Sequence, residues 1–370
     1  MKARRYSNTG RPFSGPRRVR SVNSGTLVAV LSARLALFAT LLGLVCGLSA
    51  HAAETPACAT CHPAETKLHE RTHMAHAMEP VNASAFGQNL PEAPLSEGAG
   101  GYQLLYQRKP EGVAVFAERG TDRAAGLIQW VLGAGAQGET PLVRNAGHLL
   151  ESRVSYFPAL HQYGITIGQE AGASPNATAA LGVNQPQHTL ESCIGCHATA
   201  VNRNFEPVIA GVQCQRCHAG ADDHAKGIGL PVNPGKLKPV NQVQLCGTCH
   251  RLKSPGDGKE LDNVRFQPLR LSQSRCFTSG KLECTTCHVA HQDARRNDPA
   301  FYNEKCQSCH ASQSPQGFHA DSRQHGDCIG CHMPYVQLHP ALRFTDHYIR
   351  IVKTGDYPES LFRQRGTGGS

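Results

Sequence analysis

Seven copies of one pentapeptide constrain the fold of this chain more than any other feature. Each copy reads Cys-x-x-Cys-His, with the same spacing every time. The copies, numbered here as motifs 1 to 7 in chain order, begin at Cys58, Cys193, Cys214, Cys246, Cys284, Cys306 and Cys328. This pentapeptide is the attachment signature of c-type haem, in which both thiols bind the porphyrin and the His ligates the iron. Such a chain has to fold around its cofactors.

The motifs predict seven covalently attached haem c groups. The thiols that would bind them are Cys58, Cys61, Cys193, Cys196, Cys214, Cys217, Cys246, Cys249, Cys284, Cys287, Cys306, Cys309, Cys328 and Cys331. The proximal iron ligands would be His62, His197, His218, His250, His288, His310 and His332. Zinc ribbons and iron–sulfur clusters are the alternatives, but neither requires a His directly after every second Cys.

Two cysteines lie outside the motifs, Cys46 and Cys276. We interpret Cys276 as a small buried apolar residue, with a redox or ligand role as the alternative. Cys46 belongs to the segment that we predict to be removed during export.

Residues 1–52 are predicted to be an export signal. A basic stretch precedes an apolar run from Thr26 to Ala50, and Ala50 and Ala52 offer a cleavage site. The alternative is an uncleaved membrane anchor. However, Arg34 leaves an uninterrupted run of sixteen residues, which is short of the roughly 20 that a span needs. We therefore predict a periplasmic protein whose mature chain begins at residue 53.

The charge of the chain excludes nucleic acid as a partner. The formal net charge is +9, and residues 1–52 contain eight Lys or Arg and no Asp or Glu. The predicted mature chain therefore carries a charge of only about +1, to which haem propionates would add negative charge. The basic charge is a targeting feature and forms no binding patch.

The motifs divide the mature chain unevenly. We predict a first haem segment at 53–80, a haem-poor insert at 81–188, a six-haem domain at 189–347 and a flexible tail at 348–370. The six-haem domain leaves room for little more than a short helix and a loop per haem, so porphyrins would supply much of its core.

The expected fold class is mainly α with much irregular structure, a haem-packed multihaem cytochrome fold with a small β-containing insert. Within the insert, alternating residues at 101–107 and 113–118 flank a Pro-Glu-Gly turn and predict a β-hairpin. The segments 127–132 and 149–156 are further strand candidates.

The second axial ligands are expected to be histidines. The mature chain has only three Met but twelve His besides the proximal ones. Bis-His ligation is therefore the default, and scarce His/Met ligation predicts low potentials. Three of these histidines, His69, His73 and His76, share one face of a predicted helix after motif 1, and we prefer His73 among them. The distal candidates are His73, His224, His291, His325 and His347.

Several segments resemble the multihaem cytochrome c superfamily, which includes the tetrahaem cytochrome of ammonia oxidisers, the pentahaem nitrite reductases and the octahaem hydroxylamine oxidoreductases. The matching residues are Gly211 to His218 with His224, Ser274 to Phe277, Cys284 to His288 with His291, Cys331 to Pro334, Cys58 to His76 and Trp130 to Gly135. The resemblance implies closely stacked haem pairs, bis-His ligation and His73, His224, His291 and His347 as crossed ligands.

The chain departs from this superfamily in two respects. It has no Cys-x-x-Cys-Lys, so the proximal lysine typical of the pentahaem nitrite reductases is absent, and its seven motifs fall short of the eight of the octahaem enzymes. Both departures argue against catalysis.

The sequence supports two functional hypotheses. The first is a periplasmic electron carrier that takes electrons from a quinol-oxidising or other donor and passes them to a terminal reductase or another cytochrome. The second is a reductase or oxidase of a small nitrogen or sulfur oxyanion, acting at one haem with an open axial position. Tyr156, His161 and Tyr163 could line such a pocket, or could simply pack within the insert. A structural subunit of a membrane-bound respiratory complex is a third interpretation.

Overall fold

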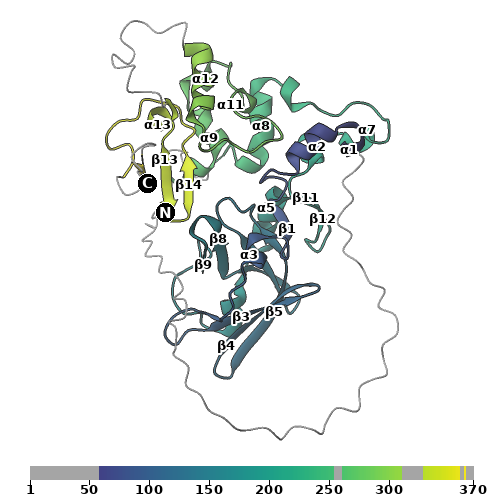
Figure 1. The fold of residues 1–370 in the computed structure, drawn as a ribbon, viewed down its shortest axis with the longest axis vertical. Helices are drawn as coiled ribbons and strands as arrows, with labels where there is room; N and C mark the ends of the chain where they lie inside the picture. Colours follow the sequence, from purple (N-terminus) through teal and green to yellow (C-terminus); the bar gives the residue numbers. More distant parts are fainter. Residues whose placement is uncertain (1–57, 254–260, 311–327, 359–361, 364–370) are drawn as a thin grey trace, which may run out of the picture.

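The structure is a computed structural model that describes residues 58–253, 261–310, 328–358 and 362–363. The predicted export signal therefore lies outside the described residues. Within them, a β-sheet forms the lower part of the molecule in Figure 1, and most of the short helices that carry the haem motifs form the upper part, while α5 (Gln187–His197) lies between the two. The two parts correspond to chain segments with and without the motifs.

The lower part is built on one eight-stranded antiparallel sheet in the order β10-β7-β6-β5-β4-β3-β2, with β1 paired to β5. The sheet curls into a half-barrel. Its strands are β1 (Met78–Pro80), β2 (Leu95–Ser96), β3 (Gln103–Lys109), β4 (Gly112–Arg119), β5 (Asp122–Leu132), β6 (Thr140–Asn145), β7 (His148–Ser152) and β10 (Gly182–Asn184).

The register of the sheet follows its side-chain pattern. In β3 and β4, which pair as a hairpin from Gln103↔Glu118 to Lys109↔Gly112, buried and more exposed residues alternate along the strands. Gly112 has a φ of +145°, and a Cβ there would lie 2.2 Å from the Ile128 carbonyl oxygen. Glycine is therefore required where this turn meets β5.

Apolar side chains of the insert form the largest core. Phe86 is fully buried and packs edge-on against Tyr106 and Tyr163, at ring-centroid distances of 5.7 and 5.3 Å. The Tyr163 hydroxyl donates hydrogen bonds to the carbonyls of Phe86 and Asn89. The segment without haem motifs thus has its own core of side chains.

Three smaller sheets complete the strands. They pair β8 (Val154–Phe157) with β9 (Gln162–Ile165), β11 (Ala198–Val201) with β12 (Pro207–Ala210), and β13 (Tyr335–His339) with both β14 (Leu342–Thr345) and β15 (Phe362–Arg363).

The helices are short, and most belong to the haem-motif part. They are α1 (Cys58–Cys61), α2 (Pro63–His69), α3 (Ala85–Gln88), α4 (Ala177–Leu181), α5 (Gln187–His197), α6 (Cys214–Cys217), α7 (Ala221–His224), α8 (Pro239–His250), α9 (Gln267–Ser272), α10 (Arg275–Thr278), α11 (Cys284–Cys287), α12 (Pro299–His310) and α13 (Cys328–His332). Single 3-10 turns lie at Pro158–Leu160, Pro234–Lys236 and Leu261–Arg265.

The insert contacts the haem-motif part through the β13–β14 hairpin. The Gln137 side-chain amide donates to the Arg343 carbonyl at 2.9 Å and accepts from the Arg343 N–H at 3.2 Å. The rings of Phe157 and His339 lie 5.6 Å apart. This contact fixes a hairpin that runs directly into Asp346 and His347.

The prediction of a mainly α-helical fold is wrong. The structure is about 33% helix and 26% strand, and the β-containing insert is not small. A segment that holds no porphyrin has to bury apolar side chains against one another, and here it does so with a sheet. This sheet also recruits β1 from the first haem segment, which increases the strand content beyond the predicted hairpin.

Candidate haem-binding site

Each described motif forms a turn of helix that brings its two cysteines to one side. In α1, α6 and α11 the four residues from Cys to Cys make the whole helix, whereas α5, α8 and α12 end in the complete motif. The N–H of His62 donates to the Cys58 carbonyl at 2.7 Å. Because residues three apart share a helix face, both thiols can meet one porphyrin edge.

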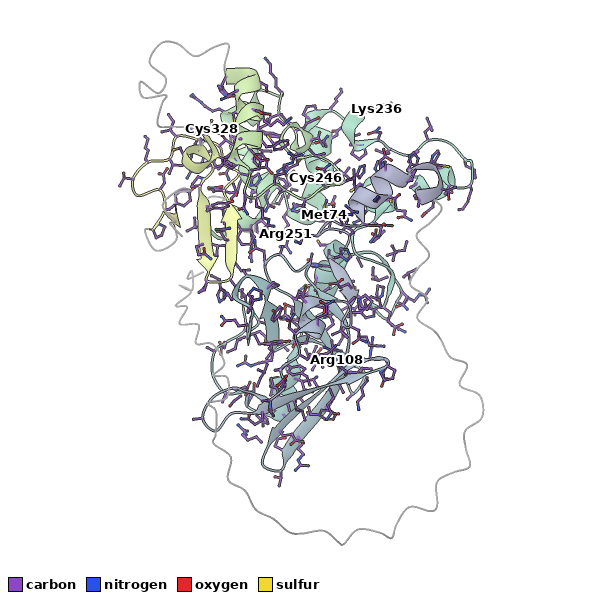
Figure 2. The ribbon with its side chains drawn as sticks, viewed as in Figure 1. Met74, Arg108, Lys236, Cys246, Arg251 and Cys328 are labelled. Carbon is purple, nitrogen blue, oxygen red and sulfur yellow. The ribbon has the colours of Figure 1, made fainter. Side chains whose placement is uncertain are left out.

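All seven motifs line one continuous cavity. Its volume is about 3090 Å³, roughly three times the upper end of the ~300–1,000 Å³ typical of a site for one small ligand. The seven proximal histidines and twelve of the fourteen motif cysteines line it. Cys246 and Cys328 lie in this upper part of the molecule, whereas Arg108 lies in the sheet (Figure 2). A cavity of this size and lining suits several large cofactors.

The lining carries an excess of positive charge. Among the described residues, eight Lys or Arg line the cavity and only three carboxylates, Glu65, Glu283 and Asp293. The cations are Arg216, Lys236, Arg275, Lys281, Arg296, Lys305, Arg343 and Arg350. The Nε of Arg216 is a buried donor without a hydrogen-bond partner in the described structure. Haem propionates would supply both the missing acceptor and the compensating charge, so the residues present fit haem.

Second contacts orient the imidazoles that line the cavity. The Nδ1 of His197 donates to the Ala77 carbonyl at 2.7 Å, and that of His218 donates to Val232 at 3.0 Å. His332 and His224 make the same bond to Arg350 and Gly229, and His250 to the Gln267 amide oxygen. A ligating His usually donates its other ring nitrogen in this way, which fixes the tautomer and leaves Nε2 as the ligand atom.

Three proximal histidines each face a distal candidate. The ring centroids lie 6.5 Å apart for His62 and His224, 6.1 Å for His218 and His291, and 6.2 Å for His288 and His347. Two imidazoles on opposite sides of one metal ion would hold their centroids roughly 6.3 Å apart, with each nitrogen about 2 Å from the metal and roughly 1.1 Å from its centroid. The three pairs match that separation, and each joins residues far apart in the chain.

His73 lines the cavity and is held by a carboxylate. Its Nδ1 donates to Asp293 Oδ2 at 2.6 Å, and its main-chain N–H donates to Asp293 Oδ1 at 2.9 Å. The two other histidines on its predicted helix face form hydrogen bonds with different partners. His69 donates its Nε2 to the Val212 carbonyl, and both ring nitrogens of His76 have partners, at Glu79 and Glu70. Of the three, His73 has the arrangement of a ligand.

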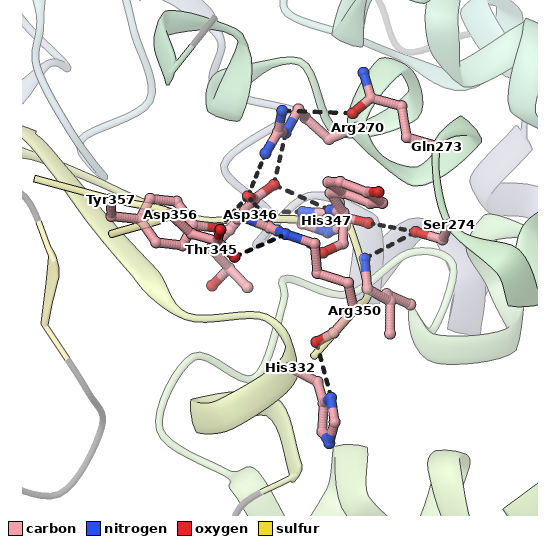
Figure 3. A network of polar contacts seen from close by, with 12 residues as sticks. Arg270, Gln273, Ser274, His332, Thr345, Asp346, His347, Arg350, Asp356 and Tyr357 are labelled. Carbon is pink, nitrogen blue, oxygen red and sulfur yellow. Dashed lines mark hydrogen bonds and ion pairs between the residues drawn. The ribbon is translucent and has the colours of Figure 1, made fainter. Parts of the chain in front are cut away.

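A buried polar network holds the segment that carries His347 (Figure 3). Arg270 donates from Nε to Asp346 Oδ1 at 2.8 Å, and the Tyr357 hydroxyl donates to Asp346 Oδ2. Burial raises the pKa of Asp346, but the bonds from Arg270 and Tyr357 outweigh it, so this pKa is lowered overall. The Ser274 hydroxyl donates to the His347 carbonyl. Tyr357 lies in the segment predicted to be a flexible tail, yet it is buried in this network.

Burial keeps the imidazoles of the deepest pair neutral. It lowers the pKa of His347 to about 4, with nearby His288 contributing, and it also lowers the pKa of His288. A neutral imidazole is the form that ligates iron. In the chain without haem, a hydrogen bond from Cys196 lowers the pKa of the Cys249 thiol to about 5.

The remaining sequence candidates fall elsewhere. His325 lies outside the described residues. Tyr156 and Tyr163 belong to the core of the insert, and their rings are 5.1 Å apart. His161 lies in a left-handed turn next to them. None of these three lines the cavity, and Gln137 is the single described residue of 81–188 that does. Cys276 lines the cavity, and burial raises the pKa of its thiol.

Two groups of functional side chains were missed by the sequence reasoning. Asp293 holds His73, and Arg270 with Asp346 holds the His347 segment. Asp293 follows His291 by two residues, but nothing in that spacing indicates a bond to a histidine 220 positions away. Their roles are visible only in three dimensions.

Two structural searches apply only to the described ranges. No helix there combines the length and apolar character needed to cross a membrane. In the same part of the chain, His, Cys, Asp and Glu side chains nowhere gather in threes as they would around a bare metal ion.

Comparison with known proteins gives three results. Residues 164–219 match the family described as cytochrome c554 and c-prime, and this region contains motifs 2 and 3. The multiheme cytochrome MtrA of Shewanella baltica (strain OS185) is 25% identical over 175 residues, covering 40% of this chain and 46% of that protein. The crystal structure of the outer cell wall cytochrome OcwA aligns with a TM-score of 0.47 and 15% identity, covering 81% of this chain and 80% of that one.

The match to MtrA spans less than half of that relative's length. Together with the attachment motifs, the family match and this relative support a multihaem c-type cytochrome with covalently bound haem. The prediction of haem binding is confirmed at this level of detail.

Proposed function

We propose that the chain is an exported, heptahaem c-type cytochrome that relays electrons in the periplasm through mainly bis-histidine haems of low potential. The observation that supports this most is the single cavity into which all seven motifs open, with three pairs of facing histidines inside it. A carrier needs saturated iron and close cofactors, and no substrate pocket.

In this proposal each motif binds one haem through its two thiols and one proximal histidine. His224, His291 and His347 are the distal ligands opposite His62, His218 and His288. His73 serves one of the remaining irons, and His325 stays a further candidate. Residues 53–80 and 189–347 carry the cofactors, while 81–188 acts as a scaffold.

The side chains position and tune the cofactors, and haem supplies one-electron redox chemistry when bound. Where two imidazoles face each other, they would hold an iron between them and keep small molecules from it. Their Nδ1 bonds fix ring orientation, and the cations in the lining compensate propionate charge. Partner proteins would donate or accept one electron at a time. We propose a quinol-oxidising donor and a terminal reductase or another cytochrome.

Whole-protein mass and visible spectra test the cofactor count. The exported protein should have seven haem mass increments on a chain that begins at residue 53, and its reduced form should show sharp absorption bands. Fewer increments would mean that some motifs stay empty. A colourless protein would overturn the proposal.

Low-temperature electron paramagnetic resonance separates a carrier from an enzyme. A carrier of this kind should give only low-spin ferric signals when it is oxidised. A high-spin signal near one haem equivalent that responds to nitrite or cyanide would instead identify an open axial position, and the protein would be a reductase or oxidase.

A further inference from the structure

Cysteines of different motifs lie close together, and their contacts give an order to the motifs in space. The Cys58 and Cys214 thiols are in hydrogen-bond contact, which joins motif 1 to motif 3. The other thiol contacts between motifs are Cys196–Cys249, Cys246–Cys284 and Cys306–Cys328. They join motif 2 to motif 4, motif 4 to motif 5, and motif 6 to motif 7.

Contacts between the helices support the same order. Helix α8, which ends in motif 4, packs against α5 with motif 2 and against α11 with motif 5. The Gln242 amide of α8 donates to Thr285 Oγ1 within motif 5 at 2.9 Å. Helix α12 packs against both α11 and α13, which places motif 6 between motifs 5 and 7. The Cys328 N–H of motif 7 donates to Asn303 in α12 at 3.0 Å.

Motif 4 is a junction between three other motifs. Cys249 contacts motif 2, Cys246 contacts motif 5, and both lie near Cys217 of motif 3. Arg216, inside motif 3, donates to the Gly195 carbonyl of motif 2 at 2.6 Å and to the Cys249 sulfur at 3.8 Å. Motifs 2 and 3 therefore both contact motif 4.

Motif 2 continues toward no further motif among the described residues, because the insert covers its other side. Ile194 and Cys193 pack with Met78, Leu132 and Leu142 of the sheet. The Nδ1 of His197 donates to Ala77, just before β1. Motif 2 thus lies between motif 4 and the insert.

From these contacts we propose that the haems form a branched electron path with three ends. The main row runs through motifs 1, 3, 4, 5, 6 and 7, and motif 2 branches from it at motif 4. This inference rests on the proposed haem occupancy. In each step one ferrous haem is oxidised and its ferric neighbour is reduced by one electron, with no proton moved. Electrons that enter at one end can leave at either of the other two, through one-electron redox proteins.

Iron positions in the unmodified holoprotein test the branching directly. Anomalous scattering from crystals, measured at the iron absorption edge, should locate seven irons. We expect the motif 4 iron to have three near iron neighbours, from motifs 2, 3 and 5. Seven irons in an unbranched row, or a motif 2 iron between those of motifs 1 and 3, would overturn the branching alone. Fewer than seven irons would count against the proposed function itself.

Electron flow gives a second test. In a Cys276→Ser background, a ruthenium photosensitiser on Asp222→Cys would inject an electron beside His224. Freeze-quench electron paramagnetic resonance would then follow reduction of the motif 7 haem. Its ferric signal is the one that is absent from the Cys328→Ser/Cys331→Ser variant. Removing motif 2 by Cys193→Ser/Cys196→Ser should cost one haem by mass and close one branch, so that the injected electrons still reach motif 7 and a larger share of them does so. The matched removal of motif 5 by Cys284→Ser/Cys287→Ser should abolish this transfer. Loss of transfer without motif 2 would place motif 2 in series and refute the branch.

Discussion

At the scale of single residues, the partner of each candidate ligand imidazole distinguishes one haem site from another. His197, His218 and His347 donate Nδ1 to main-chain carbonyls. His73 donates to the Asp293 carboxylate instead. A carboxylate partner makes an imidazole a more basic ligand, which stabilises ferric iron. The haem that His73 serves should therefore have a lower potential than a haem whose histidines are held by carbonyls.

Replacement of this carboxylate tests its effect. Asp293→Asn keeps a hydrogen-bond acceptor but removes the charge, so we expect the reduction equilibrium of one haem to shift about tenfold toward the ferrous state, which is about 59 mV for one electron. Spectroelectrochemical titration measures this shift. Asp293→Glu should restore the potential, and Asp298→Asn, at an exposed ion pair with Arg295, should leave all potentials as they are. A titration curve identical to the wild type would remove Asp293 from a tuning role.

A ligand exchange tests the role of His347. His347→Met should raise the potential of one haem by at least about 59 mV, a tenfold change in its equilibrium, because a Met ligand favours ferrous haem. The control is His339→Met, since His339 contacts Phe157 on the insert side and does not line the cavity. Equal effects of the two substitutions in the titration would argue against His347 as a ligand.

At the scale of elements, buried charges stabilise the insert. The Arg153 Nε donates to Glu97 at 3.0 Å, with side-chain exposures of 9% and 2%. Burial raises the pKa of Glu97, but bonds from Ser174 and Arg153 outweigh it, so this pKa lies below its ordinary 4.5. Since the folded pKa is the lower one, Glu97 stabilises the fold above about pH 4.5. That contribution is lost as the pH falls through the folded value.

The charge on Glu97 should therefore matter most at neutral pH. We expect Glu97→Gln to reduce the free energy of unfolding of the insert by about 3–5 kcal/mol at pH 7, because it leaves Arg153 buried without a counter-charge. The difference from the wild type should shrink on acidification below pH 4.5. Circular dichroism during thermal unfolding, at pH 7 and at a pH below 4.5, measures this difference in stability. The exposed Glu118→Gln should change stability by no more than about 0.5 kcal/mol, and a pH-independent loss in Glu97→Gln would contradict the charge argument.

The sequence pattern predicted individual strands more successfully than the way in which the strands pair into one sheet. Residues 101–107 and 113–118 predicted a hairpin, and the structure has β3 and β4 there. The pattern could not show that β1, from the first haem segment, and β10, near the end of the insert, join the same sheet. That pairing depends on contacts distant in sequence, which local alternation does not encode.

At the scale of the whole molecule, the chain uses two different ways to form a core. The insert has a large cluster of buried apolar side chains, whereas the corresponding cluster around Val264, Val336 and Tyr357 contains only those three buried residues. The haem-motif part instead surrounds the cavity. The motifs could be located from sequence, since their chemistry is local. The facing pairs could not be assigned from sequence, since His62 and His224 meet only after folding.

Removal of the cofactors should separate these two parts. In a chain produced without haem attachment, we expect amides of β3 to β7 to stay protected in hydrogen exchange, while those of α8 and α12 exchange rapidly. The holoprotein, in which both regions should be protected, is the reference. Uniform exchange across the haem-free chain would show that the insert does not fold independently.

The facing pairs also determine when each iron could gain its second imidazole during maturation. In the proposed ligand set, the iron bound at His62 waits for His224, and the iron bound at His288 waits for His347, near the end of the chain. In the proposed export, haem would be attached to each motif as the polypeptide emerges from the membrane, before its second imidazole has crossed. Coordination would then be completed only after synthesis, and early-attached irons would pass through a five-coordinate stage. A chain cut short before residue 347 should keep that stage permanently at motif 5.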